Sequence, residues 1–85
     1  MSEQANNIAQ MVAYIVEPLL DYPEELEIIS NFDISENHIL IEISVNDEDC
    51  GKVIGRQGRV IKALRTLTRA ACADTGERVD IELLD

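Results

Sequence analysis

Residues 51–64 read Gly51-Lys52-Val53-Ile54-Gly55-Arg56-Gln57-Gly58-Arg59-Val60-Ile61-Lys62-Ala63-Leu64. Two glycines, Gly55 and Gly58, bracket two polar residues, and the hydrophobic spacing of a helix begins directly after the second glycine. Glycine adopts positive φ and leaves no Cβ between the backbone and a ligand. The N–H groups that open a helix have no intrahelical acceptor and lie at its positive end. This stretch therefore predicts a tight turn between two helices, with backbone N–H groups that bind a phosphate.

Positive charge gathers around this turn although the protein as a whole is acidic. The 85 residues include 7 Lys and Arg against 17 Asp and Glu, a net charge of −10. Residues 50–73 contain no acid and six bases: Lys52, Arg56, Arg59, Lys62, Arg65 and Arg69. The other 61 residues carry all 17 acids and one base, Arg78, so +6 and −16 sum to −10. The pattern predicts a local anion site on an otherwise repelling surface, and it argues against non-specific nucleic-acid binding by bulk attraction.

The residues before this stretch predict a helix. Apolar residues recur at steps of 3 and 4, which place them on one helical face: Ile8, Met11, Val12, Ile15, Val16, Leu19 and Leu20. Ser2, Asn6 or Asn7 is expected to cap the start of the helix. Pro18 removes one backbone donor and should loosen the last turn. The segment 21–23 ends the helix because a residue that precedes proline avoids helical geometry.

Two strands follow, joined at residues 33–37 by a polar connection whose length suits a hairpin. The first predicted strand, residues 26–32, places Leu26, Ile28 and Phe32 on one face. The second, residues 39–45, alternates polar side chains with four apolar ones: Ile39, Ile41, Ile43 and Val45. Such alternation is typical of a strand that is covered on one face only.

The C-terminal half predicts two helices and a last strand. Residues 46–49 supply a cap and first-turn acids for a short helix that stops at Gly55. A second helix starts near Gly58 or Arg59, and Gly76 is expected at its C′ position. Its predicted apolar stripe consists of Val60, Leu64, Leu67 and Ala71. The last strand turns three residues inward: Val79, Ile81 and Leu83.

The predicted order is α-β-β-α-α-β, which makes this an α+β protein. A connection through two helices back to the same sheet should be right-handed and place its strands parallel. The hairpin partner would be antiparallel. We therefore expect a three-stranded mixed sheet with three helices on one face.

The residues around the turn also resemble a known signature. Residues 53–64, Val-Ile-Gly-Arg-Gln-Gly-Arg-Val-Ile-Lys-Ala-Leu, resemble the K-homology (KH) pattern V-I-G-x-x-G-x-x-I-K-x-I, with Leu64 as a conservative variant. The predicted order of elements is that of the type II KH fold. Together with Pro-Leu-Leu-Asp-Tyr-Pro-Glu-Glu at residues 18–25, the chain is similar to the bacterial KhpA (YlqC-like) family from about Ile8 to Leu84. The resemblance implies one KH domain over residues 1–85, with its motif core at about 39–84.

The resemblance implies a cytoplasmic protein that binds single-stranded RNA and acts as an RNA chaperone or post-transcriptional regulator. It also implies a homodimer, or a heterodimer with a second KH protein (KhpB, also called Jag or EloR), and a link to cell shape and cell-wall biogenesis. In a KH domain the Gly-x-x-Gly loop clamps the backbone of four nucleotides. The expected RNA-binding residues are Lys52, Val53, Ile54, Gly55, Arg56, Gln57, Gly58, Arg59 and Lys62. Among them, Val53 and Ile54 are expected to offer apolar surface to base faces.

A second interpretation is a protein–protein adaptor with little intrinsic RNA affinity. It is favoured by the acidic residues outside 50–73 and by apolar residues beyond one helical stripe: Ile61, Leu64 and Leu67. No residue constellation supports an enzyme, since the single histidine, His38, lacks a nucleophile or acid partner in the pattern. The acids of residues 47–49 lack the later ligands of a calcium loop, and we interpret them as helix-start acids. No metal or cofactor is expected, and Cys50 and Cys72 are expected to be packing residues. No apolar run is long enough to span a membrane, and the N-terminus does not resemble a signal peptide.

Overall fold

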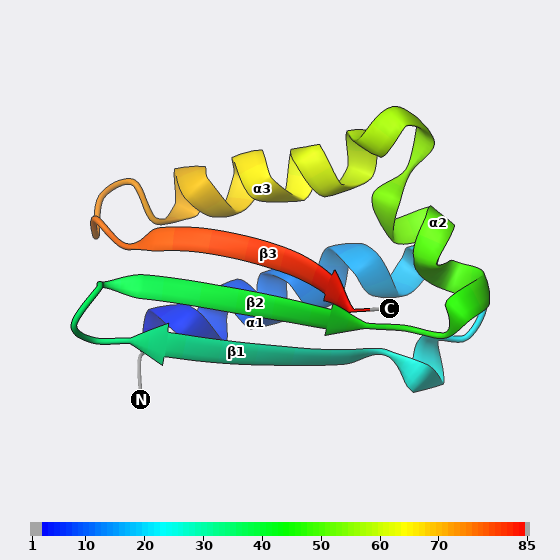
Figure 1. Cartoon of the computed structure of the whole chain (residues 1–85), viewed down its shortest axis with the longest axis horizontal. Coiled ribbons are helices and arrows are strands. Elements are labelled where there is room, and N and C mark those ends of the chain that lie inside the picture. Colours follow the sequence, from blue (N-terminus) through cyan, green and yellow to red (C-terminus); the bar gives the residue numbers. More distant parts are fainter. Residues whose placement is uncertain (1–2, 85) are drawn as a thin grey trace.

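A computed structural model describes residues 3–84, and its elements follow the predicted α-β-β-α-α-β order (Figure 1). The α-helices and strands are α1 (Glu3–Val16), β1 (Glu27–Asp33), β2 (His38–Ser44), α2 (Cys50–Ile54), α3 (Arg59–Ala71) and β3 (Arg78–Leu84). Short 3-10 helices lie at Glu17–Leu19, Pro23–Glu25, Asp47–Asp49 and Arg56–Gly58. Within residues 3–84, no helix combines the length and hydrophobicity that crossing a bilayer demands.

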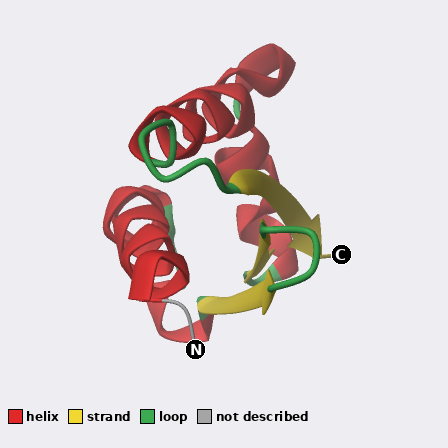
Figure 2. Ribbon diagram, turned by 90° about the vertical axis from the view of Figure 1, so that its left-hand side faces the viewer, coloured by secondary structure: helices red, strands yellow, loops and turns green. Residues whose placement is uncertain are grey.

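The three strands form one mixed sheet in the order β1-β2-β3. β1 and β2 are antiparallel, with Phe32 opposite Ile39, and β2 and β3 are parallel, with Ile41 opposite Ile81. Figure 2 shows the two long helices, α1 and α3, on the same side of the strands. The predicted α+β architecture and mixed sheet are therefore confirmed.

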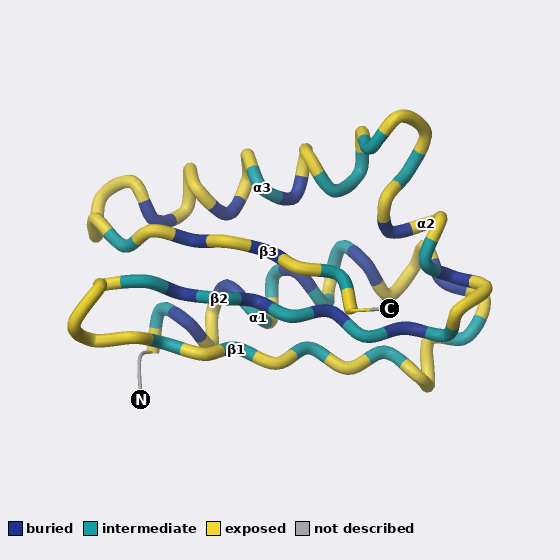
Figure 3. Tube along the Cα trace, in the orientation of Figure 1, coloured by how far each residue is buried: buried dark blue, intermediate teal, exposed yellow. Residues whose placement is uncertain are grey.

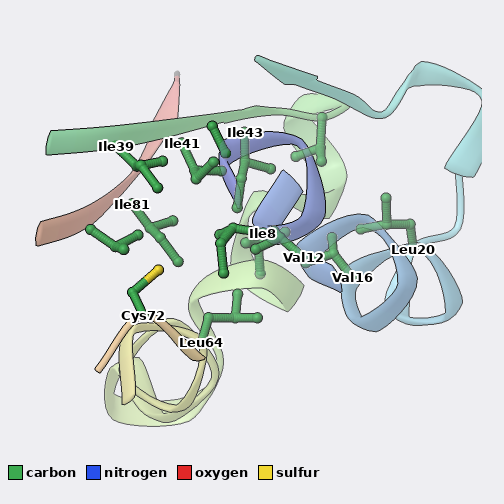
Figure 4. Close-up of a cluster of buried hydrophobic side chains, with 14 residues drawn as sticks. Ile8, Val12, Val16, Leu20, Ile39, Ile41, Ile43, Leu64, Cys72 and Ile81 are labelled. Carbon is green, nitrogen blue, oxygen red and sulfur yellow. The ribbon is translucent and has the colours of Figure 1, made fainter. Parts of the chain in front are cut away.

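The core lies between the sheet and these helices. Along β2 and β3 the buried positions alternate with more exposed ones (Figure 3), so the alternating pattern correctly predicted the inward face. Figure 4 shows Ile39, Ile41 and Ile43 from β2 gathered with Ile8 and Leu64 from the helices. The buried hydrophobic residues are Ala5, Ile8, Val12, Val16, Leu20, Ile39, Ile41, Ile43, Val45, Val53, Leu64, Cys72, Val79 and Ile81.

Two predictions about α1 are wrong. Asn6 and Asn7 lie inside the helix, which already includes Glu3, so neither caps its start; Ser2 lies outside the described residues. Leu19 is 41% exposed although it fits the hydrophobic stripe. The α-helix ends at Val16 and continues as a 3-10 helix that contains Pro18, and this changes the angle between successive residues. Leu20 still reaches the core.

The predicted inward face of α3 is confirmed for Leu64, which is buried, and for Val60, which packs against the core, but it is wrong for its C-terminal half. Leu67 is 48% exposed and Ala71 is exposed, whereas Thr68 and Cys72 are completely or almost completely buried. The Thr68 hydroxyl donates to the backbone oxygens of Leu64 (2.9 Å) and Arg65 (3.1 Å). Because the helix itself satisfies this hydroxyl, α3 can pack with a polar residue in the core while the hydrophobic Leu67 faces outward.

Of two predicted helix ends, the start of α2 is confirmed and the end of α3 is wrong. The Asn46 side chain accepts a hydrogen bond from the Glu48 N–H (2.8 Å), which confirms a cap within residues 46–49. Gly76 has a positive φ of 81° but lies beyond the C′ position, since α3 ends at Ala71. Its N–H donates to the Cys72 oxygen at 3.0 Å and closes the turn that leads into β3.

Candidate nucleic-acid interface

The predicted turn between two helices is present at residues 55–58, at the upper right corner of Figure 1. α2 ends at Ile54, the 3-10 helix Arg56–Gly58 follows, and α3 begins at Arg59. The Gly55 N–H donates to Gly51 (2.9 Å), and the Gly58 N–H donates to Gly55 (3.1 Å). The side chains of Arg56 and Gln57 are exposed. The N–H groups of Gly55, Gly58 and Arg59 already have backbone acceptors, so the corner offers an anion the exposed side chains of residues 56–57 and the positive end of α3.

The two glycines serve different purposes. Gly55 has φ 78° and ψ 171°, and a Cβ there would lie 2.4 Å from Val60 Cγ2 and 2.8 Å from the Val60 nitrogen. Gly58 has φ 75°, but its nearest obstacle to a Cβ is Lys62 Cε at 3.8 Å. Gly55 is therefore required by the packing of α3 against the turn. Gly58 leaves open space beside the backbone, where a ligand can approach.

Uncompensated positive charge surrounds the turn. Arg56, Arg59 and Lys62 are exposed. In the part of the chain that the structure describes, none of the three forms an ion pair with a carboxylate. The Arg59 guanidinium donates to Gln57 Oε1 at 3.5 Å. An anion at this corner would meet three cations that are not already neutralised, next to the positive end of α3.

Lys52 differs from these three cations. Its ammonium lies 2.9 Å from Asp21 Oδ2 and 3.3 Å from Asp49 Oδ1. The hydrogen bond to Asp21, followed by that to Asp49, raises the pKa of Lys52 above its ordinary value against the opposing effect of desolvation. A phosphate near Lys52 would have to compete with these two carboxylates.

The prediction that Val53 offers apolar surface to a base is wrong. Val53 is completely buried and belongs to the hydrophobic core. The next residue, Ile54, is 42% exposed beside the turn. Successive residues of a helix point about 100° apart, and here the first side chain points into the core while the second points away from it. Of this pair, only Ile54 remains available to a ligand.

The sequence alone did not predict the role of Asp49. This carboxylate is completely buried and accepts hydrogen bonds from the N–H groups of Asp21 (3.0 Å) and Tyr22 (2.9 Å), besides Lys52. Burial alone raises the pKa of Asp49, but the two backbone donors and the Lys52 ammonium outweigh it and lower the pKa below the ordinary value. No local pattern distinguishes Asp49 from the exposed Asp47, because the partners lie 27 and 28 residues away.

No candidate metal centre accompanies the turn. Among residues 3–84, no three or more His, Cys, Asp or Glu side chains gather in a way that could hold a metal ion. Cys50 is partly buried and Cys72 is buried. The chemistry that the corner offers is the binding of an anion.

Comparison with known proteins identifies similar chains. The family model described as KhpA/KhpB, KH domain, matches residues 9–83. The chain is 39% identical to RNA-binding protein KhpA of Borreliella burgdorferi over 85 residues, which cover 100% of both chains. It is 35% identical to RNA-binding protein KhpA of Bacillus subtilis over 79 residues, 93% of this chain and 95% of that one. The crystal structure of Aquifex aeolicus Era superposes with a TM-score of 0.62 at 20% identity, covering 98% of this chain and 31% of Era, which is a likeness of fold.

Proposed function

The chain belongs to the KhpA/KhpB KH-domain family, as its resemblance at residues 53–64 predicted, and from this membership we propose that it binds single-stranded RNA through residues 55–58. The observation that carries the proposal is the exposed, positive-φ turn with Arg56, Arg59 and Lys62 unpaired beside it. Backbone phosphates bind these cations beside the positive end of α3, and one base rests on Ile54. Paired bases are unavailable to such a groove, so duplex RNA competes poorly.

The biological role that we propose follows from the same family. The protein acts in the cytoplasm as an RNA chaperone or post-transcriptional regulator, together with a second KH protein of the KhpB type, and contributes to control of cell shape and cell-wall biogenesis. It acts by binding, without a catalytic step or a cofactor. Relatives called RNA-binding protein KhpA, which match this chain over nearly their full length, support the RNA-binding part of this role.

A dual charge reversal at the turn tests the proposed RNA site. Replacing Arg56 and Gln57 with Asp changes the local charge by −3 and puts two carboxylates where the phosphate would lie. We expect the affinity for a short single-stranded RNA, measured by fluorescence anisotropy, to fall at least about tenfold. Both side chains are exposed, so the melting temperature should stay within a few degrees of that of the unmodified chain.

A matched control carries the same charge change far from the turn. Gln10→Asp combined with Arg78→Asp also changes the net charge by −3, at exposed positions on α1 and β3. This control should lower RNA affinity by less than about threefold. Unchanged RNA affinity in a folded Arg56→Asp, Gln57→Asp protein would move the function to the adaptor interpretation.

The dependence of RNA affinity on salt counts the phosphate contacts. Three free cations, Arg56, Arg59 and Lys62, predict a slope of log K against log salt of about −2, at roughly −0.7 per contact for single strands. Between about 50 and 200 mM salt the affinity should then fall roughly 20-fold. A slope near zero would contradict binding through the phosphate backbone.

Self-association is favoured by one specific feature of α3. The side of α3 that carries the exposed Leu67 also carries two exposed small residues, Ala63 and Ala70. A small domain gains stability when it buries further apolar surface against another chain. We propose that this side contributes to a homodimer or to a heterodimer with the second KH protein.

Leu67→Asp tests this surface. The substitution places a charge in the contact, and we expect at least about a tenfold weaker dimer by sedimentation equilibrium. Gln10→Asp is the matched control, because it makes the same change in net charge at an exposed position on α1. A monomer at high micromolar concentration before any substitution would exclude the homodimer.

A further inference from the structure

One face of the sheet is not covered by the long helices. α1 and α3 pack on the other face (Figure 2), and the inward side chains of the strands alternate with outward ones. The outward residues of the central strand, β2, are only partly buried. The outward side chains across the three strands are Glu27, Ile29, Asn31, Asp33, His38, Leu40, Glu42, Ser44, Arg78, Asp80, Glu82 and Leu84. We call these residues the open sheet face.

The open sheet face is acidic and its acids are incompletely paired. Asp80 lies 2.7 Å from His38 Nε2, and Arg78 is engaged by Glu36 at 3.4 Å. The parallel register places Glu42 directly opposite Glu82, and like charges in that position destabilise a sheet. In the described part of the chain neither glutamate forms an ion pair, although Glu42 accepts a hydrogen bond from Asn31 at 3.0 Å. A cation placed over this pair would relieve the repulsion.

The same face is also apolar and hollowed at one end. An open pocket of about 470 Å³ lies beside the β1–β2 hairpin and is lined by Asn31, Phe32, Asp33, Ile34, His38 and Leu40. Ile34 is 83% exposed and Ile29, farther along β1, is 44% exposed. Half of the lining is apolar and half is polar, so the pocket offers an anchoring side chain of a protein partner an apolar contact with polar groups beside it.

We propose that the open sheet face is a docking surface for a Lys- and Arg-containing segment of a partner protein, with one apolar side chain of that segment seated in the hairpin pocket. The charge complementarity selects a basic protein, because the same carboxylates repel nucleic acid. A second copy of this chain is a poorer occupant. Its bases other than Arg78 lie within residues 50–73, and seating them here would remove them from RNA.

The two surfaces would then work independently. The hairpin lies at the left end of the molecule in Figure 1, and the turn at residues 55–58 lies at the right end. RNA bound to the basic corner would therefore leave the open sheet face free for the partner. The protein would then bind an RNA at its basic corner and a basic protein at its acidic sheet face at the same time.

The test is a titration of the isotopically labelled full chain, followed by amide NMR shifts. The probe is a short synthetic peptide in which lysines alternate with serines around a single central leucine. We expect the shifts to concentrate in β1, β2, β3 and the hairpin. A peptide with serine in place of the leucine should bind about threefold more weakly, and one with glutamates in place of the lysines should not bind.

The decisive variant is Glu42→Gln combined with Glu82→Gln. It should lower the affinity for the lysine peptide about fivefold. It should also raise the melting temperature by a few degrees, because it removes the like-charge pair. Glu17→Gln combined with Glu24→Gln makes the same change in net charge at exposed positions off the sheet, and should do neither. Shifts confined to α2 and α3, or equal weakening by both variants, would overturn the docking surface. RNA affinity of the Glu42→Gln, Glu82→Gln protein should change less than about twofold, which separates this result from the proposed RNA site.

Discussion

Gly55→Ala is expected to be less stable than the unmodified chain by about 3 kcal/mol or more. The new Cβ would lie 2.4 Å from Val60 Cγ2 and 2.8 Å from the Val60 backbone nitrogen, so the start of α3 would have to move. The backbone of Gly55, at φ 78° and ψ 171°, also lies in a region that only glycine occupies readily. The free energy of unfolding of an 85-residue domain is roughly 4–13 kcal/mol, so this loss is a large fraction of the total stability.

Gly58→Ala is the matched control for this prediction. Gly58 also has a positive φ, 75°, but a Cβ there would have no neighbour closer than 3.8 Å. The expected loss is about 1 kcal/mol, the cost of holding alanine in the left-handed region. Urea unfolding of both variants measures the difference. Equal losses at Gly55 and Gly58 would show that the contact with Val60 does not govern the turn.

Asp49→Ala should also have a large effect: we expect the melting temperature to fall by roughly 10–20 °C. The substitution leaves the Asp21 and Tyr22 N–H groups without their acceptor and opens a space where a fully buried carboxylate lay. It also removes one of the two partners of Lys52. Because Asp49 directly precedes α2, the segment that leads to the turn loses its attachment to residues 21–22.

Asp47→Ala is the control for Asp49, since Asp47 belongs to the same 3-10 helix but is exposed. Its melting temperature should change by no more than a few degrees. Circular dichroism melts of both variants provide the measurement. A melting temperature for Asp49→Ala that equals that of Asp47→Ala would show that the hydrogen bonds to Asp21 and Tyr22 do not stabilise the fold.

The lowered pKa of Asp49 determines how the stability of the fold changes with pH. The folded state holds this carboxylate ionised more strongly than the unfolded chain does, so the contribution to stability is complete above the ordinary value of 3.8. It is lost as the pH falls from there through the lower folded-state pKa. Asp49→Asn lacks this ionisation, and its stability should therefore fall less between pH about 5 and 2 than that of the unmodified chain.

Much of this protein followed from local sequence patterns. Alternation of apolar residues at 39–45 and 79–83 correctly predicted two inward strand faces, because successive side chains of a strand point to opposite sides. Gly55 and Gly58 correctly predicted a turn between helices, since both have the positive φ that glycine accommodates. The signature at residues 53–64 predicted a KH domain, and together with residues 18–25 it predicted the KhpA family, which the comparisons confirm.

Tertiary structure alone decided which of the predicted residues are available to a ligand. Val53 and Ile54 are both apolar, but the sheet and α1 lie on the side to which Val53 points, so only Ile54 stays exposed. Lys52 belongs to the basic run, yet Asp21, 31 residues away, neutralises it. Thr68 lies in the core and Leu67 outside it because β3 packs on the side of α3 that carries Thr68, whose hydroxyl is satisfied within its own helix. The local period fixes which side chains share a face, and the segments that fold against that face, distant in sequence, determine whether it is buried, paired or free.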